Sequence, residues 1–351
     1  MDPTILARLL APAFLAEHMA RQPACHLALQ GATLRSATPR EIDAPGYLSD
    51  LTGVVLDWGD AVAGVPARAV LKVSHPGFGQ PELPFYETIA ARLASPVIPR
   101  FYAGGVDEAT GRTWLLMEDL SESHQRPSEA PLPPTLARNA QIVEALARFH
   151  AAGRDAGQAP GTGGTTLWER LRASDWQDGA WQRLQAQAGD ALDERTRGMY
   201  AQFLRGFAAL VERADRLSQR TWVHGDAHVW NWMVPREGNA AGVAKLIDWD
   251  GWHLGVGVWD LSYMMAVQWD RSVRARFEMP LLDRYHAALV ASGVGDYSRE
   301  TLQQDYRLAV LLHLRTPLAR FARGMSAYVW WPQIGRVADA VEDLGCLDLM
   351  G

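Results

Sequence analysis

Short apolar runs, each bounded by Gly, Pro, Ser or Asp, follow one another along residues 26–118. Such runs are typical of β-strands, and five can be recognised: HLALQGATLR, TGVVLDW, ARAVLKV, RFYAGGV and RTWLLME. One segment among them, residues 82–94, instead repeats apolar residues at helical spacing, with Phe85, Ile89 and Leu93. The pattern predicts a small five-stranded antiparallel sheet carrying one helix, which is inserted before the fourth strand.

A polar, proline-rich stretch, SESHQRPSEAPLPP at residues 121–134, follows the last of these strands and marks a boundary. Beyond it the helical period prevails, except in residues 222–248, which indicate a loop and a short hairpin. The predicted helices cover residues 135–152, 193–217, 259–270, 276–292, 299–323 and 333–345. The fold class is therefore α+β and bilobal, with a β-rich N-terminal lobe at residues 1–120 and a mostly helical C-terminal lobe at residues 121–351.

The residues before the first predicted strand, MDPTILARLLAPAFLAEHMARQ, predict a short amphipathic helix, because charged residues and a proline interrupt the apolar ones. This pattern does not fit a signal peptide, and no run of about 18 apolar residues predicts a transmembrane helix. Cys25 and Cys346 stand far apart and outside any metal-binding motif, so neither a disulfide framework nor a structural zinc site is expected. These features predict a cytoplasmic protein.

Acidic residues outnumber basic ones by 40 to 34, which gives a formal net charge of −6. Nucleic-acid-binding domains usually carry a basic patch, so the charge balance argues against a nucleic-acid partner. It mildly favours a neutral or cationic small ligand.

The segment TWVHGDAHVWNWMV, residues 221–234, places several polar residues in apolar surroundings. His224, Asp226, His228 and Asn231 stand within eight positions of one another. Buried polar side chains need partners, so the segment indicates a metal site, a catalytic site or an internal hydrogen-bond network.

The segment continues as NWMVPREGNAAGVAKLIDWD, in which two apolar runs, residues 232–234 and 245–247, are joined by turn residues. If the runs pair as a hairpin, Asn231 before the first lies beside Asp248 after the second. An amide oxygen and a carboxylate are ligands suited to Mg²⁺, which also binds substrate phosphates. Asp226 would face the same pocket. The arrangement is that of a kinase-like phosphotransferase, in which Asp226 positions an alcohol and takes its proton late in the transfer.

HGDAHVWN, together with IDWD and WDL, resembles the aminoglycoside phosphotransferase and choline-kinase-like superfamily, whose usual pattern is H-G-D-x-H-x-x-N followed by I-D-W/F. The resemblance covers most of the chain, from about residue 28 to the C-terminal helices. It implies a kinase-like fold, ATP or GTP as donor, Mg²⁺ as cofactor and a hydroxyl on a small molecule as acceptor. Protein kinases instead carry His-Arg-Asp, Asp-Phe-Gly and Ala-Pro-Glu, which this chain lacks.

The resemblance also implies roles for residues of the N-terminal lobe. Lys72 in ARAVLKV would reach the nucleotide phosphates, braced by Glu82. The segment ELPFY, which begins with Glu82, matches the E-x-x-F-Y pattern of the ecdysteroid-kinase-like branch. Because Pro84 favours a first helical turn, Glu82 could stand at the helix start, and Glu87 is the alternative partner of Lys72.

The segment LLMEDL would form the hinge that meets the adenine edge, through backbone groups of Glu118, Asp119 and Leu120. The loop over the phosphates would be APGYLSDLTG at residues 44–53, which has no G-x-G-x-x-G pattern, and Ser49 is its candidate contact. By the same resemblance, Asp260 in GVWDLSYMM would brace the catalytic loop by accepting hydrogen bonds from its backbone or from His224. His228 would brace the loop too, or lie near the acceptor.

Two other classes of function stay open at this point. The chain could be a nucleotide-binding scaffold without catalysis, or a metal-dependent hydrolase that uses His224, Asp226 and His228. The acceptor also stays open: the acidic balance favours an aminoglycoside or amino alcohol, and the ELPFY segment favours a bulky apolar alcohol.

Overall fold

The computed structural model describes residues 2–22, 25, 29, 32–42, 49–59, 65–76, 82–93, 95–130, 132–155, 165–173, 179–239 and 242–350. The chain forms two compact units. Unit 1 comprises Met1–Gln125 and Pro235–Gly242, and unit 2 comprises Arg126–Val234 and Val243–Gly351. None of the helices described is both long and apolar enough to cross a membrane.

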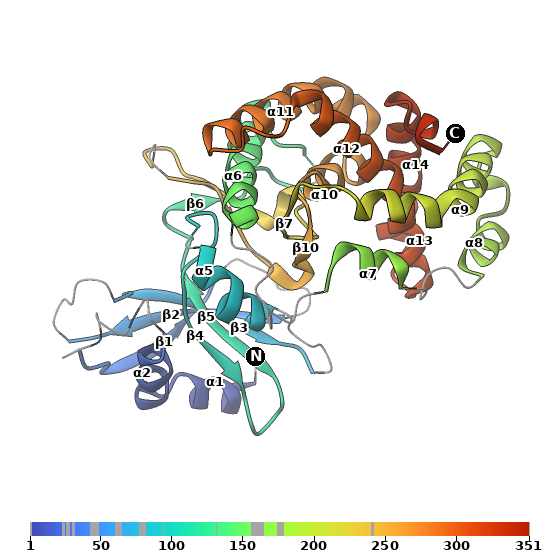
Figure 1. The fold of residues 1–351 in the computed structure, drawn as a ribbon. Coiled ribbons are helices and arrows are strands. Elements are labelled where there is room, and N and C mark those ends of the chain that lie inside the picture. Colours follow the sequence, from blue (N-terminus) through green and yellow to red (C-terminus); the bar gives the residue numbers. More distant parts are fainter. Residues whose placement is uncertain are drawn as a thin grey trace. The chain divides into compact units, whose positions relative to one another are not determined.

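Unit 1 is built on a five-stranded antiparallel sheet in the order β1-β2-β3-β5-β4 (Figure 1). Its strands are β1 (Ser36–Arg40), β2 (Ser49–Asp57), β3 (Arg68–Ser74), β4 (Phe101–Val106) and β5 (Thr113–Glu118). The short strand β6 (His124–Gln125) follows. Four of the five strands coincide with predicted apolar runs, because β-branched and aromatic residues suit a pleated, half-buried surface.

The first predicted strand, residues 26–35, is wrong: residues 29 and 32–35 are not in a strand, and the other residues of that run lie outside the described part. The sheet takes β1 in its place. The sequence of β1, SATPR, has no apolar alternation, and the strand is defined by its pairing with β2, from Ser36 opposite Asp57 to Arg40 opposite Gly53. As an edge strand it tolerates Pro39, which cannot donate to a ladder.

The N-terminal segment forms two helices, α1 (Pro3–Leu9) and α2 (Pro12–Ala20), where one was predicted. Pro12 accounts for the break, since a proline cannot continue a helix but is well placed at the start of the next. Both helices contribute to a core that includes sheet residues. Its members include Ile5, Leu9, Leu15 and Met19 from the helices, and Val54, Leu56, Ala69, Leu71, Val73, Trp114 and Leu116 from the strands. Because Leu71 and Val73 share this face, the alternation of a strand directs Lys72 to the other face.

The predicted helix 82–94 is present as one continuous helical segment. It begins as α4 (Glu82–Pro84), widens into the π-helix η1 (Phe85–Ala90) and ends as α5 (Ala91–Leu93). Pro84 lies in the first turn, where its missing N–H leaves no helical hydrogen bond unmade. The helix therefore begins at Glu82.

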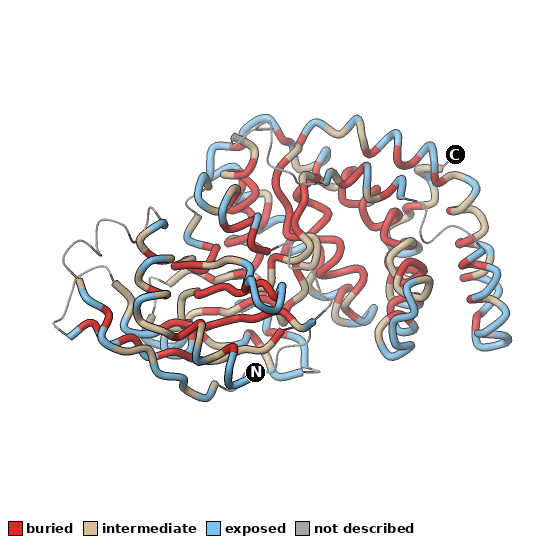
Figure 2. Tube along the Cα trace, turned by 90° about the horizontal axis from the view of Figure 1, so that it is seen from below, coloured by how far each residue is buried: buried red, intermediate tan, exposed pale blue. Residues whose placement is uncertain are grey.

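Unit 2 is mostly helical, and Figure 2 shows buried positions along one side of its helices. The long helices are α6 (Leu136–Asp155), α9 (Glu194–Asp215), α11 (Arg271–Ala291), α12 (Arg299–Leu312) and α14 (Ala327–Asp343). Shorter ones are α7 (Leu167–Arg172), α8 (Ala180–Ala188), α10 (Val258–Ser262), which continues as the π-helix η6 (Tyr263–Val267), and α13 (Arg315–Ala322). Single 3₁₀ turns are η3 (Gly189–Ala191), η4 (Val229–Asn231), η5 (Trp249–Gly251) and η7 (Cys346–Met350).

Two helical predictions need correction. The predicted helix 299–323 is divided into α12 and α13, because Pro317 has no N–H to bond the carbonyl of His313. The prediction also omitted α7 and α8, whose apolar periodicity is short. A capping box in which the Thr166 side chain and Glu169 bond each other's backbone N–H starts α7, and this T-x-x-E signal was available in the sequence.

The non-helical part of unit 2 contains two small antiparallel pairs. Strand β7 (Arg220–Val223) pairs with β10 (His253–Val256), and β8 (Trp232–Pro235) pairs with β9 (Lys245–Leu246). The second pair is the predicted hairpin, with Trp232 opposite Leu246. An antiparallel sheet followed by a mostly helical part confirms the predicted α+β class.

Candidate active site

In unit 1, the structure pairs Lys72 with Glu82. Lys72 lies on the central strand β3, opposite Leu51 on one side and Leu115 on the other. Its Nζ lies 2.5 Å from Oε2 of Glu82, and the two side chains are only 8% and 1% exposed. A buried cation is tolerated when a carboxylate accompanies it. Glu87, the alternative partner in the prediction, is exposed.

The predicted hinge residues are held by local hydrogen bonds. Glu118 exchanges backbone and side-chain bonds with Arg100: its N–H donates to the Arg100 carbonyl (2.9 Å), and its Oε2 accepts from the Arg100 N–H (3.0 Å). Asp119 accepts from Arg40 Nη2 at 2.5 Å, and the Leu120 carbonyl accepts from the His124 N–H at 2.9 Å. These bonds fix the course of the segment that follows β5.

Ser49 begins β2 and is buried opposite Ser74. The predicted phosphate-covering loop begins before it, and residues 44–48 of that loop lie outside the described residues.

In unit 2, Asp260 fixes the backbone of the predicted catalytic loop, residues 224–231. Its carboxylate is fully buried and accepts the N–H of His224 (2.7 Å) on Oδ2 and that of Gly225 (2.8 Å) on Oδ1. His150 Nε2 lies 3.2 Å from Oδ2. Burial alone would raise the pKa of Asp260, but these hydrogen bonds and the neighbouring His150 hold it below its usual value, so the group stays ionised. Asp260 thus accepts the backbone bonds that the sequence suggested, and His150 is a further contact that the sequence did not indicate.

Two glycines allow the catalytic loop to contact the loop after β9. Gly225 has φ +80°, and a Cβ there would lie 2.3 Å from the carbonyl oxygen of Gly251. A Cβ on Gly251 would in turn lie 2.8 Å from the carbonyl oxygen of His224. Glycine is required at both positions because the backbones approach too closely for a side chain. The sequence analysis did not identify Gly251, which stands three positions after the predicted metal ligand Asp248.

His224 joins the same two loops through its ring. Its Nε2 donates to the Ile247 carbonyl (3.0 Å), and its Nδ1 accepts the N–H of Asp226 (3.2 Å). The ring packs edge-on against buried Trp249, with centroids 4.7 Å apart. Both ring nitrogens are therefore engaged in holding the loop.

Asp226 is the accessible carboxylate of the loop, with a side chain 38% exposed. Its Oδ1 accepts a hydrogen bond from the Tyr263 hydroxyl, which itself accepts one from Arg320 Nη2. The same Oδ1 lies 3.7 Å from Arg320 Nη2. The sequence analysis identified neither Tyr263 nor Arg320. A signal existed for Tyr263, because it follows Asp260 by three positions and so lies on the same face of the helix.

His228 and Asn231 complete the surroundings of Asp226. His228 Nε2 lies 3.6 Å from Asp226 Oδ2, and burial lowers the pKa of His228, so the ring is neutral near pH 7. Asn231 Nδ2 donates to the Asp226 carbonyl (2.9 Å) and lies 3.5 Å from its Oδ2. Since these contacts use Nδ2, Oδ1 is the Asn231 atom suited to a cation.

Asp248 follows the hairpin as predicted. The N–H of Ile247 donates to the Asn231 carbonyl (2.9 Å), so Asn231 stands opposite the residue next to Asp248. Asp248 has φ 67° and ψ 62°, and is the non-glycine residue with positive φ among those described. Such a left-handed conformation costs about 1–2 kcal/mol, and strain of this kind is concentrated at functional sites.

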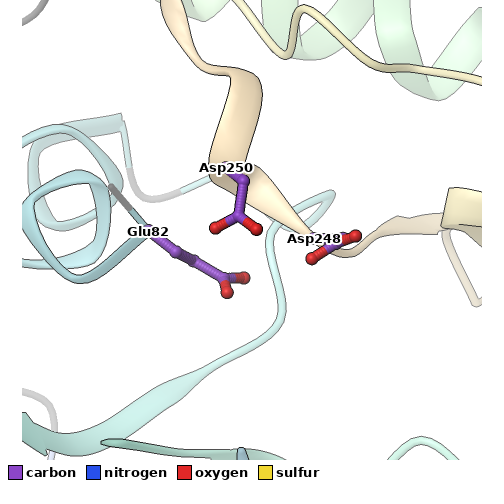
Figure 3. Close-up of side chains that lie close together, drawn as sticks. All are labelled: Glu82, Asp248 and Asp250. Atoms are coloured by element: carbon purple, nitrogen blue, oxygen red, sulfur yellow. The ribbon is translucent and has the colours of Figure 1, made fainter. Parts of the chain in front are cut away.

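Asp250 is a second carboxylate on this loop, which the sequence reading did not assign. Figure 3 shows Asp248 and Asp250 on the loop that follows β9, and their carboxylate oxygens lie within 4.8 Å of each other. Two carboxylates and an amide oxygen match the oxygen ligands that Mg²⁺ takes in proteins. The donor set of this loop and Asn231 therefore fits the predicted metal. Figure 3 also labels Glu82, at the start of α4 in unit 1.

Comparison with solved structures identifies the fold to which this geometry belongs. Three solved structures share the fold at 14% sequence identity. They are a candidate aminoglycoside phosphotransferase from Ralstonia eutropha (TM-score 0.56, 98% of this chain and 97% of that chain), an aminoglycoside 2'-phosphotransferase in complex with GDP (0.54, 93% and 96%) and a microcompartment-associated aminopropanol kinase (0.53, 88% and 91%). The predicted kinase-like fold is confirmed.

The sequence itself matches a family model, although no curated protein matches the chain. The model describes the phosphotransferase enzyme family (APH) and matches residues 62–300. The match includes Lys72 and the whole catalytic loop, and it spans well over half of the sequence. The chain therefore belongs to the phosphotransferase enzyme family, as its motifs suggested.

Proposed function

We propose that the chain transfers the γ-phosphoryl group of ATP to a hydroxyl of a small molecule, with Asp226 as the catalytic residue. The observation that carries this proposal is an accessible carboxylate on a loop whose backbone is held by buried Asp260. A carboxylate is too weak a base to ionise an alcohol in the ground state. Asp226 therefore acts by orienting the hydroxyl and accepting its proton late in the transfer.

Mg²⁺ would be held by Asn231 and Asp248, with Asp250 as a further donor. When bound, the ion neutralises charge on the phosphates of the nucleotide. Lys72, braced by Glu82, would steady the same phosphates, and the backbone of Glu118, Asp119 and Leu120 would meet the adenine. Ser49, in the segment expected to cover the phosphates, would contact them. In this proposal residues 1–120 bind the nucleotide, and residues 121–351 supply the catalytic loop and the acceptor site.

The ELPFY segment, which matches the pattern of the ecdysteroid-kinase-like branch, favours a bulky alcohol as the acceptor. The aminoglycoside and aminopropanol enzymes of similar fold supply the other, cationic class. The relative in complex with GDP is a reason to test GTP as donor beside ATP.

The two alternative functions are a metal-dependent hydrolase and a nucleotide-binding scaffold without catalysis. A hydrolase using His224, Asp226 and His228 as metal ligands is disfavoured, because both ring nitrogens of His224 already have partners. An inactive scaffold would not need an accessible carboxylate at residue 226. It is tested by the same experiment as the proposed function.

The experiment measures ADP release from Mg·ATP, and GDP release from Mg·GTP, with a panel of hydroxylated acceptors. Aminoglycosides, amino alcohols, sugars, sterols and macrolides form the panel, and Asp226→Asn is assayed beside the wild type. We expect one class to raise turnover and Asp226→Asn to reduce that rise about 10³-fold. Exposed Asp190, on η3, gives the matched control Asp190→Asn, which should keep wild-type turnover. Nucleotide binding without any acceptor-dependent turnover would instead support the scaffold.

A further inference from the structure

One helix of unit 2 contacts the predicted catalytic loop at two points. Asp260 on α10 accepts two backbone N–H groups of the loop, from His224 and Gly225. Three residues later, the Tyr263 hydroxyl donates a hydrogen bond to Oδ1 of Asp226. Residues i and i+3 share a helical face, so one face of this helix supplies both contacts. Asp260 fixes the backbone of the loop, whereas Tyr263 fixes the side chain of Asp226.

Tyr263 is buried in unit 2 and keeps its proton. It is 3% exposed, and its ring centroid lies 5.8 Å from that of buried His313. It begins the π-helix η6, and π-helical turns are frequent at functional sites. Burial raises the pKa of Tyr263, and the charge of Asp226 raises it further. The hydroxyl is therefore the donor in its bond with Asp226.

Arg320 extends this contact into a chain of hydrogen bonds. Its Nη2 donates to the Tyr263 hydroxyl, and the same Nη2 lies 3.7 Å from Asp226 Oδ1. Its guanidinium carbon lies 5.5 Å from the centroid of the Tyr263 ring. Hydrogen bonds in a chain polarise one another, so a charged donor makes the hydroxyl a stronger donor to the carboxylate. Oδ1 is thus held by a neutral hydroxyl with a positive charge behind it.

The other oxygen of Asp226 has longer contacts among the described residues. Oδ2 lies 3.5 Å from Asn231 Nδ2 and 3.6 Å from His228 Nε2. These distances are beyond those of a normal hydrogen bond. The Asp226 side chain is nevertheless 38% exposed. Because Oδ1 already has a partner, Oδ2 is the oxygen available to an incoming hydroxyl.

We propose that Tyr263 and Arg320 are positioning residues for Asp226, which hold its Oδ1 so that Oδ2 faces the acceptor hydroxyl and accepts its proton. The inference rests on the proposed function and adds to it the oxygen that acts and the residues that select it. In the transfer, the acceptor oxygen bonds the γ-phosphorus as the hydroxyl proton passes to Oδ2. The bond from that phosphorus to the bridging oxygen breaks, and its electron pair leaves with ADP. A carboxylate that is already oriented loses no rate to unproductive orientations.

The experiment removes each contact and keeps the surrounding side chains. Tyr263→Phe loses only the hydroxyl, and Arg320→Gln and Arg320→Lys change the donor behind it. Tyr306→Phe is the matched control, because the buried Tyr306 hydroxyl also donates to a buried carboxylate, that of Glu278 (2.7 Å). Glu278 is likewise accompanied by an arginine, Arg274 (2.9 Å), and belongs to α11, outside the site.

Three measurements are made with the full chain. Steady-state kinetics are recorded with the acceptor that most raises ADP release and, without acceptor, for the hydrolysis of Mg·ATP by water. Calorimetry with a non-hydrolysable Mg·ATP analogue gives the Kd values of nucleotide and acceptor. Crystal structures of the wild type and of Tyr263→Phe give the orientation of the Asp226 carboxylate.

We expect Tyr263→Phe and Arg320→Gln each to lower kcat about 10- to 100-fold, the loss of a hydrogen bond to a charged group, with KM and Kd near their wild-type values. The double variant should lose little more, because both residues act through Oδ1. Arg320→Lys should be intermediate, since lysine keeps the charge and loses the planar fork. Tyr306→Phe should keep the wild-type kcat. In the crystals, Tyr263 should bond Oδ1 in the wild type, and the carboxylate should be turned in Tyr263→Phe.

The outcomes separate this inference from the proposed function. A wild-type kcat in Tyr263→Phe, with turnover that still needs Asp226, would overturn the inference and leave the function intact. An equal loss of kcat in Tyr306→Phe would also overturn it, since the loss would then reflect general destabilisation. So would a raised acceptor KM with unchanged kcat, because Tyr263 would then bind the acceptor.

Failure of the proposed function has a different signature. Asp226→Asn as active as the wild type would overturn the function and, with it, the inference. If no turnover is detected, the crystal structures decide about positioning. An Asp226 carboxylate that keeps its orientation in Tyr263→Phe would then show that Tyr263 does not position it.

Discussion

Asp260 holds the predicted catalytic loop from within the protein, because its buried carboxylate accepts two backbone N–H groups of that loop. In Asp260→Asn the shape is kept, but an amide nitrogen must face one of these donors. We expect the free energy of unfolding to fall by about 3 kcal/mol, as for a buried charge partner removed. Turnover should fall more than about tenfold, and KM for the nucleotide should stay unchanged. Urea unfolding and steady-state kinetics measure both effects.

A surface carboxylate provides the comparison for Asp260. Asp283 pairs with Arg299 and is 67% exposed, so Asp283→Asn should cost at most about 1 kcal/mol and leave turnover unchanged. Equal stability losses in the two variants would contradict the central role given to Asp260.

Gly225 tests the close approach of the two loops. Gly225→Ala places a methyl group 2.3 Å from the Gly251 carbonyl oxygen in a left-handed conformation, so it should both destabilise the fold and abolish turnover. Gly293 has φ +92° with nothing within 4 Å of a Cβ, so Gly293→Ala carries only the conformational cost of about 1–2 kcal/mol. We expect Gly225→Ala to be clearly the less stable in thermal unfolding. Matching melting temperatures would show that the loops can separate at little cost.

At the scale of elements, the pair formed by β3 and α4 makes a stability prediction. Lys72→Met removes the cation beside a carboxylate that is 1% exposed, and should cost about 3–5 kcal/mol. The double variant Lys72→Met/Glu82→Leu should recover much of this loss, because two apolar side chains then replace the ion pair. Both variants should lose nucleotide affinity. A double variant as unstable as the single one in urea would show that Lys72 acts through other partners.

The elements predicted correctly are those whose own residues specify them. Strands β2, β3 and β5 are runs of β-branched and apolar residues, and the helix from Glu82 has an apolar face of its own. Strand β1 has no such pattern and forms because β2 offers a free edge. The division between α12 and α13 depends on one proline, which periodicity alone does not weigh.

The candidate site divides in the same way. Asp226, Asn231, Asp248 and Asp260 could be assigned because they lie at fixed spacing in one stretch of sequence. His150 and Arg320 could not, because each comes from a helix far from that stretch and reaches the loop only through packing. The residues that support the loop can therefore be identified only from the structure, whereas the residues on the loop can be identified from the sequence.

At the scale of the whole molecule, buried histidines predict acid sensitivity. Burial lowers the pKa of both His253 and His313 to about 3. Above pH 6.5 both histidines are neutral in the folded and in the unfolded protein. Below pH 6.5 the unfolded chain binds protons at these histidines that the folded chain does not bind. The free energy of unfolding therefore falls toward pH 3, by about 1.4 kcal/mol per pH unit for each of the two histidines.

The contribution of His313 can be isolated by difference. Buried Glu278 and Asp305 have raised pKa values and act in the opposite direction as the pH falls, but they are common to both proteins compared. Between pH 6 and pH 4.5, unfolding free energies of His313→Gln should change less steeply than those of the wild type, by about 1.4 kcal/mol per pH unit. Parallel curves would mean that His313 is protonated in the folded state.

The most direct test of the central claim is to follow the γ-phosphorus of Mg·ATP by ³¹P NMR in the presence of the acceptor that most raises ADP release. The account predicts that this signal is replaced by that of a phosphomonoester in equal amount to the ADP formed, and that Asp226→Asn forms none over the same time. Inorganic phosphate as the only product, or equal phosphomonoester from Asp226→Asn, would contradict it.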